Sequence, residues 1–217
     1  MRLVDAHHHL WDLAAVEYPW LNARGVRRFF GDPTPIQRDY GPADLRSDAR
    51  PHELVASVHV QVGCRAGLEV EETRWLQQVA ERDGLPSAIV AGADLAAPDL
   101  AARLAKHARS PRLRGVRQIV GREPADDART GAGRVLDDPA FAAGLRTLAA
   151  AGLSFDLQLT VPQMPRAAAL FERVPELAVA LCHCGSPWDR SAEGLAAWRA
   201  GLARLARLPR SACKLSG

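Results

Sequence analysis

Short apolar runs alternate with longer amphipathic segments along the whole chain. Apolar runs predict β-strands at residues 2–9, 54–62, 87–95, 113–120, 153–160, 177–184 and 211–217. Amphipathic segments predict helices at residues 72–84, 98–110, 138–152, 164–176 and 192–209. Pro98 and Asp99 mark the start of one helix, and Gly84 and Gly152 mark the ends of two others, each just before a strand. Repeated alternation of strand and helix favours a parallel sheet.

The strand count predicts an α/β fold of the (β/α)8 TIM-barrel type that lacks its eighth strand. Such barrels typically need about 250 residues and eight strands, whereas this pattern has 217 residues and ends on a seventh strand. We expect residues 1–217 to form a single barrel domain. A barrel without its last strand has two unpaired edges, so we expect either a longer natural chain or a homo-oligomer that covers the gap.

The long connection at residues 11–53 has no clear hydrophobic period and is rich in proline, glycine and aromatic residues. Connections of this length are usually functional. It follows the first strand, so it is expected to lie over the mouth of the barrel, where active sites sit. Its aromatic side chains either wall a pocket or hold the loop to the barrel rim; Trp20 is the one we expect to contact a substrate.

Composition narrows the class of protein. The chain is 47% hydrophobic and 24% charged, with a formal net charge of +3, which is ordinary for a globular protein. No dense block of Lys and Arg suggests a nucleic-acid partner. There is no signal-peptide pattern and no apolar run of about 18 residues, so no membrane partner is expected and the chain is interpreted as cytoplasmic.

The triple histidine of the first strand is the clearest chemical signal. Because side chains alternate along a strand, His7 and His9 are expected to share one face with Asp5, and His8 is expected to point the other way and be structural. Two imidazoles side by side can address one ligand or one metal ion. In the second strand, alternation is expected to turn His59 and Gln61 toward the inside of the barrel and the valines toward the covering helices. Gln61 is a candidate substrate contact, and His59, which sits deeper, is interpreted as a hydrogen-bonded core residue.

Later strands add further polar positions near their ends. Arg117 ends the fourth strand and could hold a carbonyl or carboxylate with two hydrogen bonds; the alternative is an ion pair with Asp94 or Asp156. Gln158, on the polar face of the fifth strand, is a candidate substrate contact. In the sixth, Cys182-His183-Cys184, alternation turns the cysteines away from His183. We therefore predict His183 as functional, and the cysteines as neither metal ligands nor a mutual disulfide.

Taken in order, the segments VDAHHHLWD, YPWL, RDYGPADL, ETRWL, GVRQIV, FDLQL, CHCGSPW and KLSG resemble the amidohydrolase superfamily. The branch they resemble is the amidohydrolase-related group that contains L-fuconolactonase and 2-pyrone-4,6-dicarboxylate lactonase. The resemblance implies a (β/α)8 hydrolase that opens a small lactone. It places the strand-one His-x-His on His7 and His9, the strand-six histidine on His183, and the arginine that contacts substrate oxygens on Arg117.

The same resemblance sets expectations about metal and base. The strand-five position, a histidine in metal-rich relatives, is Gln158 here, and a bridging lysine is not evident on the fourth strand, so a binuclear site is not expected. A single Zn²⁺ on His7, His9 and His183 and a metal-free site both stay open. The aspartate that activates water on strand eight has no counterpart in these 217 residues, which predicts weak activity for them.

Three functions are compatible with this pattern. The first is a hydrolase that opens a sugar-acid or dicarboxylate lactone. The second is a metal-dependent decarboxylase or hydratase of the same superfamily. The third is an inactive, truncated barrel that only binds a ligand.

Overall fold

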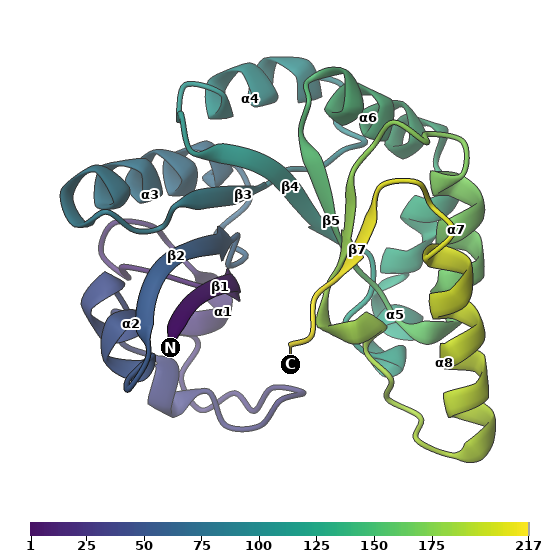
Figure 1. The fold of residues 1–217 in the computed structure, drawn as a ribbon, viewed down its shortest axis with the longest axis horizontal. Helices are drawn as coiled ribbons and strands as arrows, with labels where there is room; N and C mark the ends of the chain where they lie inside the picture. Colours follow the sequence, from purple (N-terminus) through teal and green to yellow (C-terminus); the bar gives the residue numbers. More distant parts are fainter. Residues whose placement is uncertain (217) are drawn as a thin grey trace. The chain divides into compact units, whose positions relative to one another are not determined.

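A computed structural model describes residues 1–216, except the side chains of residues 126 and 127. These residues form two compact units. Unit 1 comprises Met1–Gly92 and Arg103–Arg114, and unit 2 comprises Ala93–Ala102 and the chain from Gly115 onward. Each unit is built from parallel strands connected by helices, as the alternating pattern predicts (Figure 1).

In unit 1, β1 (Arg2–His8), β2 (Glu53–Val60) and β3 (Ala88–Gly92) pair in parallel and in chain order. In unit 2, the strands β5 (Ser154–Gln158), β6 (Val179–Leu181) and β7 (Ser211–Cys213) do the same, together with β4 (Leu113–Ile119), which belongs to this unit from Gly115 on. All seven predicted strands are therefore present between residues 1 and 216. β6 is shorter than predicted, because the backbone leaves the extended conformation soon after Leu181.

The five predicted helices correspond to α3 (Glu69–Asp83), α4 (Leu100–His107), α6 (Pro139–Ala150), α7 (Met164–Phe171) and α8 (Ala192–Leu205). Gly84 follows α3 with a left-handed φ of 79°, the conformation that glycine adopts most readily. Three helices were not predicted: α1 (Pro19–Asn22), α2 (Pro42–Asp48) and α5 (Pro124–Thr130). In the part of the chain that the structure describes, no helix is long and apolar enough to cross a membrane.

The predicted irregular loop at residues 11–53 is more ordered than its sequence indicates. Trp11 and Tyr40 form an antiparallel bridge through two backbone hydrogen bonds of 3.1 and 3.0 Å. Tyr18, fully buried, packs with Trp11, Val16, Leu21 and Val62. Tyr18 and Tyr40 therefore hold the loop against the rest of unit 1, while Phe29 and Phe30 stay about half exposed.

The pairing of β1 with β2 contains two irregularities that change which side chains share a face. Leu3 pairs with Leu54 but Val4 pairs with Ala56; Asp5 pairs with Ser57 but His8 pairs with His59. Each shift inserts an extra residue into one strand and reverses the alternation beyond it.

One prediction about the faces of β2 is wrong. His59 lies opposite Ile89 of β3, and Ile89 packs with Leu45 of α2 and with Leu76 and Val79 of α3. Paired positions in neighbouring strands point to the same side of a sheet, so His59 lies on the helix-covered face. By alternation, Val58 and Val60, which were predicted to pack under helices, occupy the opposite face.

The core of unit 2 lies between β5 and its helices. Phe141 of α6, Phe155 of β5 and Phe171 of α7 are buried, with neighbouring ring centroids 5.9 and 5.7 Å apart. Gly144 lies so close to the backbone carbonyl of Leu95 that an added Cβ would be 2.1 Å from its oxygen. Close packing of this kind holds β5, and hence its polar residues, in place.

Candidate functional site

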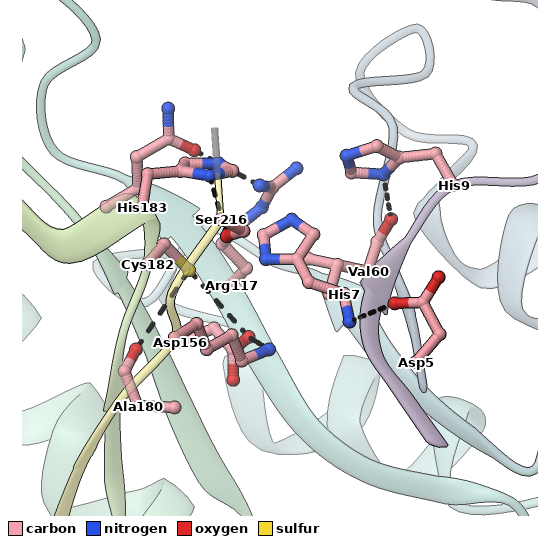
Figure 2. Close-up of polar contacts among 12 residues, drawn as sticks. Asp5, His7, His9, Val60, Arg117, Asp156, Ala180, Cys182, His183 and Ser216 are labelled. Atoms are coloured by element: carbon pink, nitrogen blue, oxygen red, sulfur yellow. Dashed lines mark hydrogen bonds and ion pairs between the residues drawn. The ribbon is translucent and has the colours of Figure 1, made fainter. Parts of the chain in front are cut away.

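In unit 1, the carboxyl end of β1 presents two imidazoles, His7 and His9. Their ring centroids lie 5.2 Å apart with the planes nearly perpendicular. Nδ1 of His9 lies 2.7 Å from the carbonyl oxygen of Val60, and a carbonyl can only accept. Nδ1 therefore carries the proton, and Nε2 of neutral His9 carries the lone pair that a ligand or metal ion would use. Figure 2 shows this contact.

Asp5 does not share the face of the two histidines, and that prediction is wrong. Figure 2 shows the rings of His7 and His9 on one side of β1 and the Asp5 carboxylate on the other. Asp5 instead accepts a hydrogen bond of 2.9 Å from the backbone N–H of His7. The register shift between Asp5 and His8 explains the difference, because alternation does not continue through an inserted residue.

His8 and His59 are buried on the other face of these strands, 6% and 0% exposed. Their rings meet edge to face with centroids 5.8 Å apart. Burial lowers the pKa of His8 to about 4, so its ring is neutral at pH 7. Nδ1 of His59 accepts a hydrogen bond from the backbone N–H of Leu10 at 3.1 Å, so His59 is a hydrogen-bonded core residue as interpreted.

The two other unit 1 candidates lie near the end of β2. Trp20 donates its indole N–H to the carbonyl of Val62 at 2.9 Å and meets the ring of Phe30 edge to face at 6.3 Å. Gln61 is buried, and its Cβ and Cγ lie against Gly92, close to Glu69 of α3. Contact of either residue with a substrate stays a prediction.

In unit 2, Arg117 of β4 and Gln158 of β5 form a buried polar pair. Arg117 donates to the side-chain oxygen of Gln158 at 3.1 Å, and the two residues are 5% and 8% exposed. The backbone carbonyl of Gln158 accepts hydrogen bonds from Val120 and Gly121, which anchors the end of the strand. The guanidinium is thereby held in a fixed orientation near the ends of β4 and β5.

His183 lies in a left-handed turn that sequence alternation did not predict. The φ angles of His183, Cys184, Gly185 and Ser186 are 52°, 52°, 71° and 50°. Each non-glycine residue in this conformation costs roughly 1–2 kcal/mol. Hydrogen bonds hold the turn: Cys184 donates to the Lys214 carbonyl at 3.0 Å, and the indole of Trp198 donates to the Cys184 carbonyl at 2.7 Å. Maintained strain of this kind is typical of functional sites.

The imidazole of His183 is half buried, with Nδ1 3.1 Å from the hydroxyl oxygen of Ser216 (Figure 2). Burial lowers its pKa, and the positive charges of Arg117 and Lys214 lower it further. The ring is therefore neutral at pH 7, available to accept a proton or to donate its own N–H.

Lys214 is a residue that the sequence reasoning missed. Its ammonium donates to Asp156 Oδ2 at 2.5 Å, and the side chains of Lys214 and Asp156 are 12% and 3% exposed. Asp156, weighed above as a partner of Arg117, is thus ion-paired with Lys214. The sequence does contain a signal for this pair: Lys214 ends the seventh predicted strand, and Asp156 lies on the polar face of the fifth.

Cys182 and Cys184 are both free thiols. Cys182 is buried with Sγ 3.9 Å from Asp156 Oδ2, and burial raises its pKa to about 12. Cys184 lies within the left-handed turn, so strand alternation does not extend to it.

The arrangement of potential ligand side chains indicates whether a metal ion could be held. Among the side chains that the structure describes, which exclude those of residues 126 and 127, no group of three or more His, Cys, Asp or Glu is arranged to hold a metal ion. A catalytic zinc usually takes three protein ligands, and the pair at the end of β1 supplies two. Unit 1 by itself is therefore an incomplete zinc site.

Comparison with known proteins identifies the family. The family model described as Amidohydrolase matches residues 4–217. The chain belongs to the amidohydrolase family. The uncharacterized protein y4mH of Sinorhizobium fredii is 37% identical over 217 residues, which cover 99% of this chain and 72% of that protein. An L-fucono-1,5-lactonase of Burkholderia multivorans is 36% identical over 219 residues, covering 99% of this chain and 67% of that protein.

A solved structure supports the same assignment. The crystal structure of an amidohydrolase from Burkholderia multivorans with bound zinc superposes with a TM-score of 0.78 at 34% identity. It covers 99% of this chain and 69% of that chain. The amidohydrolase family, the barrel fold class and the prediction of a hydrolase are therefore confirmed.

Proposed function

We propose that this amidohydrolase opens the ester ring of a small sugar-acid lactone with water. The observation that supports this best is the set of unit 2 groups formed by a fixed guanidinium, a paired ammonium and a half-buried imidazole, whose pKa is lowered first by burial and then by those two positive charges. Relatives named L-fucono-1,5-lactonase match 99% of the chain and support the same substrate class.

In this proposal, Arg117 binds the carbonyl oxygen of the lactone. Its planar fork can hold a carbonyl or carboxylate oxygen with paired N–H groups, and its hydrogen bond to Gln158 pre-orients it. When water attacks the carbonyl carbon, the negative charge that develops on the oxygen is stabilised by these donors more than the ground state is. Lys214 contributes less, since Asp156 neutralises it.

In this proposal, His183 takes part in proton transfer. Hydrolysis breaks the ring C–O bond, adds the hydroxyl of water to the carbonyl carbon, and delivers the water's proton to the departing alkoxide. A neutral imidazole can donate a hydrogen bond to that oxygen or accept a proton. Two carboxylates, Asp94 and Asp156, were considered above as partners of Arg117. Asp156 pairs with Lys214, and exposed Asp94 accepts a hydrogen bond from the backbone N–H of Ala96.

In unit 1, His7 and His9 are assigned as ligand-binding imidazoles. Nε2 of His9 carries a lone pair suited to a single Zn²⁺, which would polarise a carbonyl or a bound water when present.

The test is an assay of the full natural chain on a panel of five- and six-membered sugar lactones. A pH-stat monitors hydrolysis by titrating the hydroxy acid that is released. Arg117→Ala should lower kcat about 10²–10³-fold, the usual cost of one oxyanion donor. Arg173 is exposed, so Arg173→Ala is the matched control. Zinc is measured in parallel, with at most one equivalent expected. Hydrolysis no faster than the spontaneous rate on every lactone, or an Arg117→Ala enzyme as active as the control, would refute the proposal.

A further inference from the structure

The β1–β2 ladder ends at the pair His8 and His59, and the next backbone donor in β1 is taken by a side chain. Leu10 is fully buried, so its N–H has no access to bulk water. The imidazole Nδ1 of His59 accepts this N–H at 3.1 Å. A side chain of β2 thus continues the cross-strand hydrogen bonding for two residues beyond the last pairing.

This hydrogen bond defines the protonation of His59. A backbone N–H can only donate, so Nδ1 of His59 must carry a lone pair, and the proton of the neutral ring lies on Nε2. The ring is fully buried, between an edge-to-face contact with His8 at 5.8 Å and another with His9 at 6.2 Å.

His9 is therefore held from two adjacent positions of β2. The carbonyl of Val60 accepts from its ring at 2.7 Å, which selects the tautomer with a lone pair on Nε2. His59 accepts from the backbone of the residue that follows His9 and packs against the His9 ring. One contact orients the ring, and the other fixes the backbone that carries it.

We propose that His59 is a positioning residue that fixes the backbone after His9 and so the direction of His9 Nε2. The part concerning catalysis rests on the function proposed above for His9; the part concerning the His9 ring does not. His59 itself is buried on the helix-covered face of β2 and is assigned no contact with substrate.

The experiment compares two replacements of His59 in the full natural chain. His59→Leu removes the acceptor while keeping an apolar side chain of comparable size. His59→Asn keeps an oxygen acceptor close to the place of Nδ1. We expect His59→Leu to lower kcat roughly 10- to 100-fold, the usual effect of removing a residue that orients a ligand, and His59→Asn to restore most of that loss.

A second readout needs no activity. Long-range 1H–15N spectra of histidine-labelled protein report which ring nitrogen is protonated, with His9→Gln identifying the His9 signals. His9 should show the Nδ1–H tautomer in the wild type and in His59→Asn, and an averaged pattern in His59→Leu. If no lactone is hydrolysed at all, the proposed function fails, but these spectra still decide whether His59 positions His9.

His107→Leu is the matched control, because His107 is another buried histidine of unit 1, with Nδ1 2.8 Å from the Thr73 hydroxyl. It should lose stability but keep kcat and the His9 spectrum. The inference is overturned if His59→Leu leaves the His9 signals unchanged, or if His59→Asn behaves like His59→Leu, because the acceptor would then be irrelevant. Should His59→Leu fail to fold, the spectrum of His59→Asn alone decides: a lost Nδ1–H signature refutes the inference.

Discussion

Replacing Lys214 by methionine should destabilise the protein by leaving a buried carboxylate without its ammonium. Methionine keeps most of the length and apolar stem of lysine, so the change is mainly one of charge. In the wild type, Lys214 and Asp156 form a short ion pair, with side chains only 12% and 3% exposed. Asp156 also lies opposite Arg117 in the β4–β5 register.

The magnitude follows from burial. Removing one partner of a buried ion pair typically costs about 3–5 kcal/mol, because the remaining charge stays desolvated. The neighbouring guanidinium of Arg117 offers partial compensation, which places the expectation near the lower end, about 3 kcal/mol. For a chain of this size each kcal/mol lowers Tm by roughly 2–4 °C, so Tm should fall by about 6–12 °C.

Urea unfolding at pH 7 of the wild type, Lys214→Met, Asp156→Leu and the double variant gives the full thermodynamic cycle. The double variant should be more stable than Lys214→Met, because no unpaired charge remains in it. A loss below about 1 kcal/mol in Lys214→Met, the range of exposed ion pairs, would refute the reasoning. So would a double variant as unstable as the sum of the two single changes, since the pair would then have no coupling.

Two further predictions concern stability. Gly144→Ala should lower the free energy of unfolding by about 1–3 kcal/mol through overpacking, because the new Cβ would be 2.1 Å from the Leu95 carbonyl oxygen. The control Gly41→Ala, whose new Cβ would have nothing within 4 Å, should change Tm little in the same thermal melt. His107 has a pKa lowered by burial, despite the opposing charges of Glu69 and Glu71. Unfolding therefore takes up a proton below about pH 6.5, and stability contributed by neutral His107 is present above that pH and lost as pH falls toward the folded pKa. Urea midpoints at pH 7.5 and 5.5 should fall more in the wild type than in His107→Leu; equal falls would contradict this.

Local signals in the sequence were sufficient for the strands, the longer helices and several of their ends. Gly84 ends α3 in the left-handed conformation, and Asp138 caps α6 by accepting from the backbone N–H of Ala140 at 2.8 Å. These features depend on neighbours within a few residues, so their physical causes are present in the sequence. The family motifs along the chain were equally local, and the family was predicted from them.

The geometry of the candidate site depends on contacts between residues that are far apart in the sequence. Alternation alone placed Asp5 beside His7, because the register shift that reverses it arises only when β1 and β2 pair. It also could not tell which face of β2 the helices cover, so His59 was expected on the wrong face. The Lys214–Asp156 pair joins positions 58 residues apart in the chain, and no local pattern relates them.

By itself the sequence determined the alternating elements, the family and the residue types available for chemistry, because hydrophobic periodicity and short motifs act over a few residues. Tertiary structure alone decided the tautomer of His9, the left-handed turn that carries His183, and the partner of Asp156. Each of these depends on which atoms from distant segments come within hydrogen-bonding distance, and that is set by strand register and packing rather than by local preference.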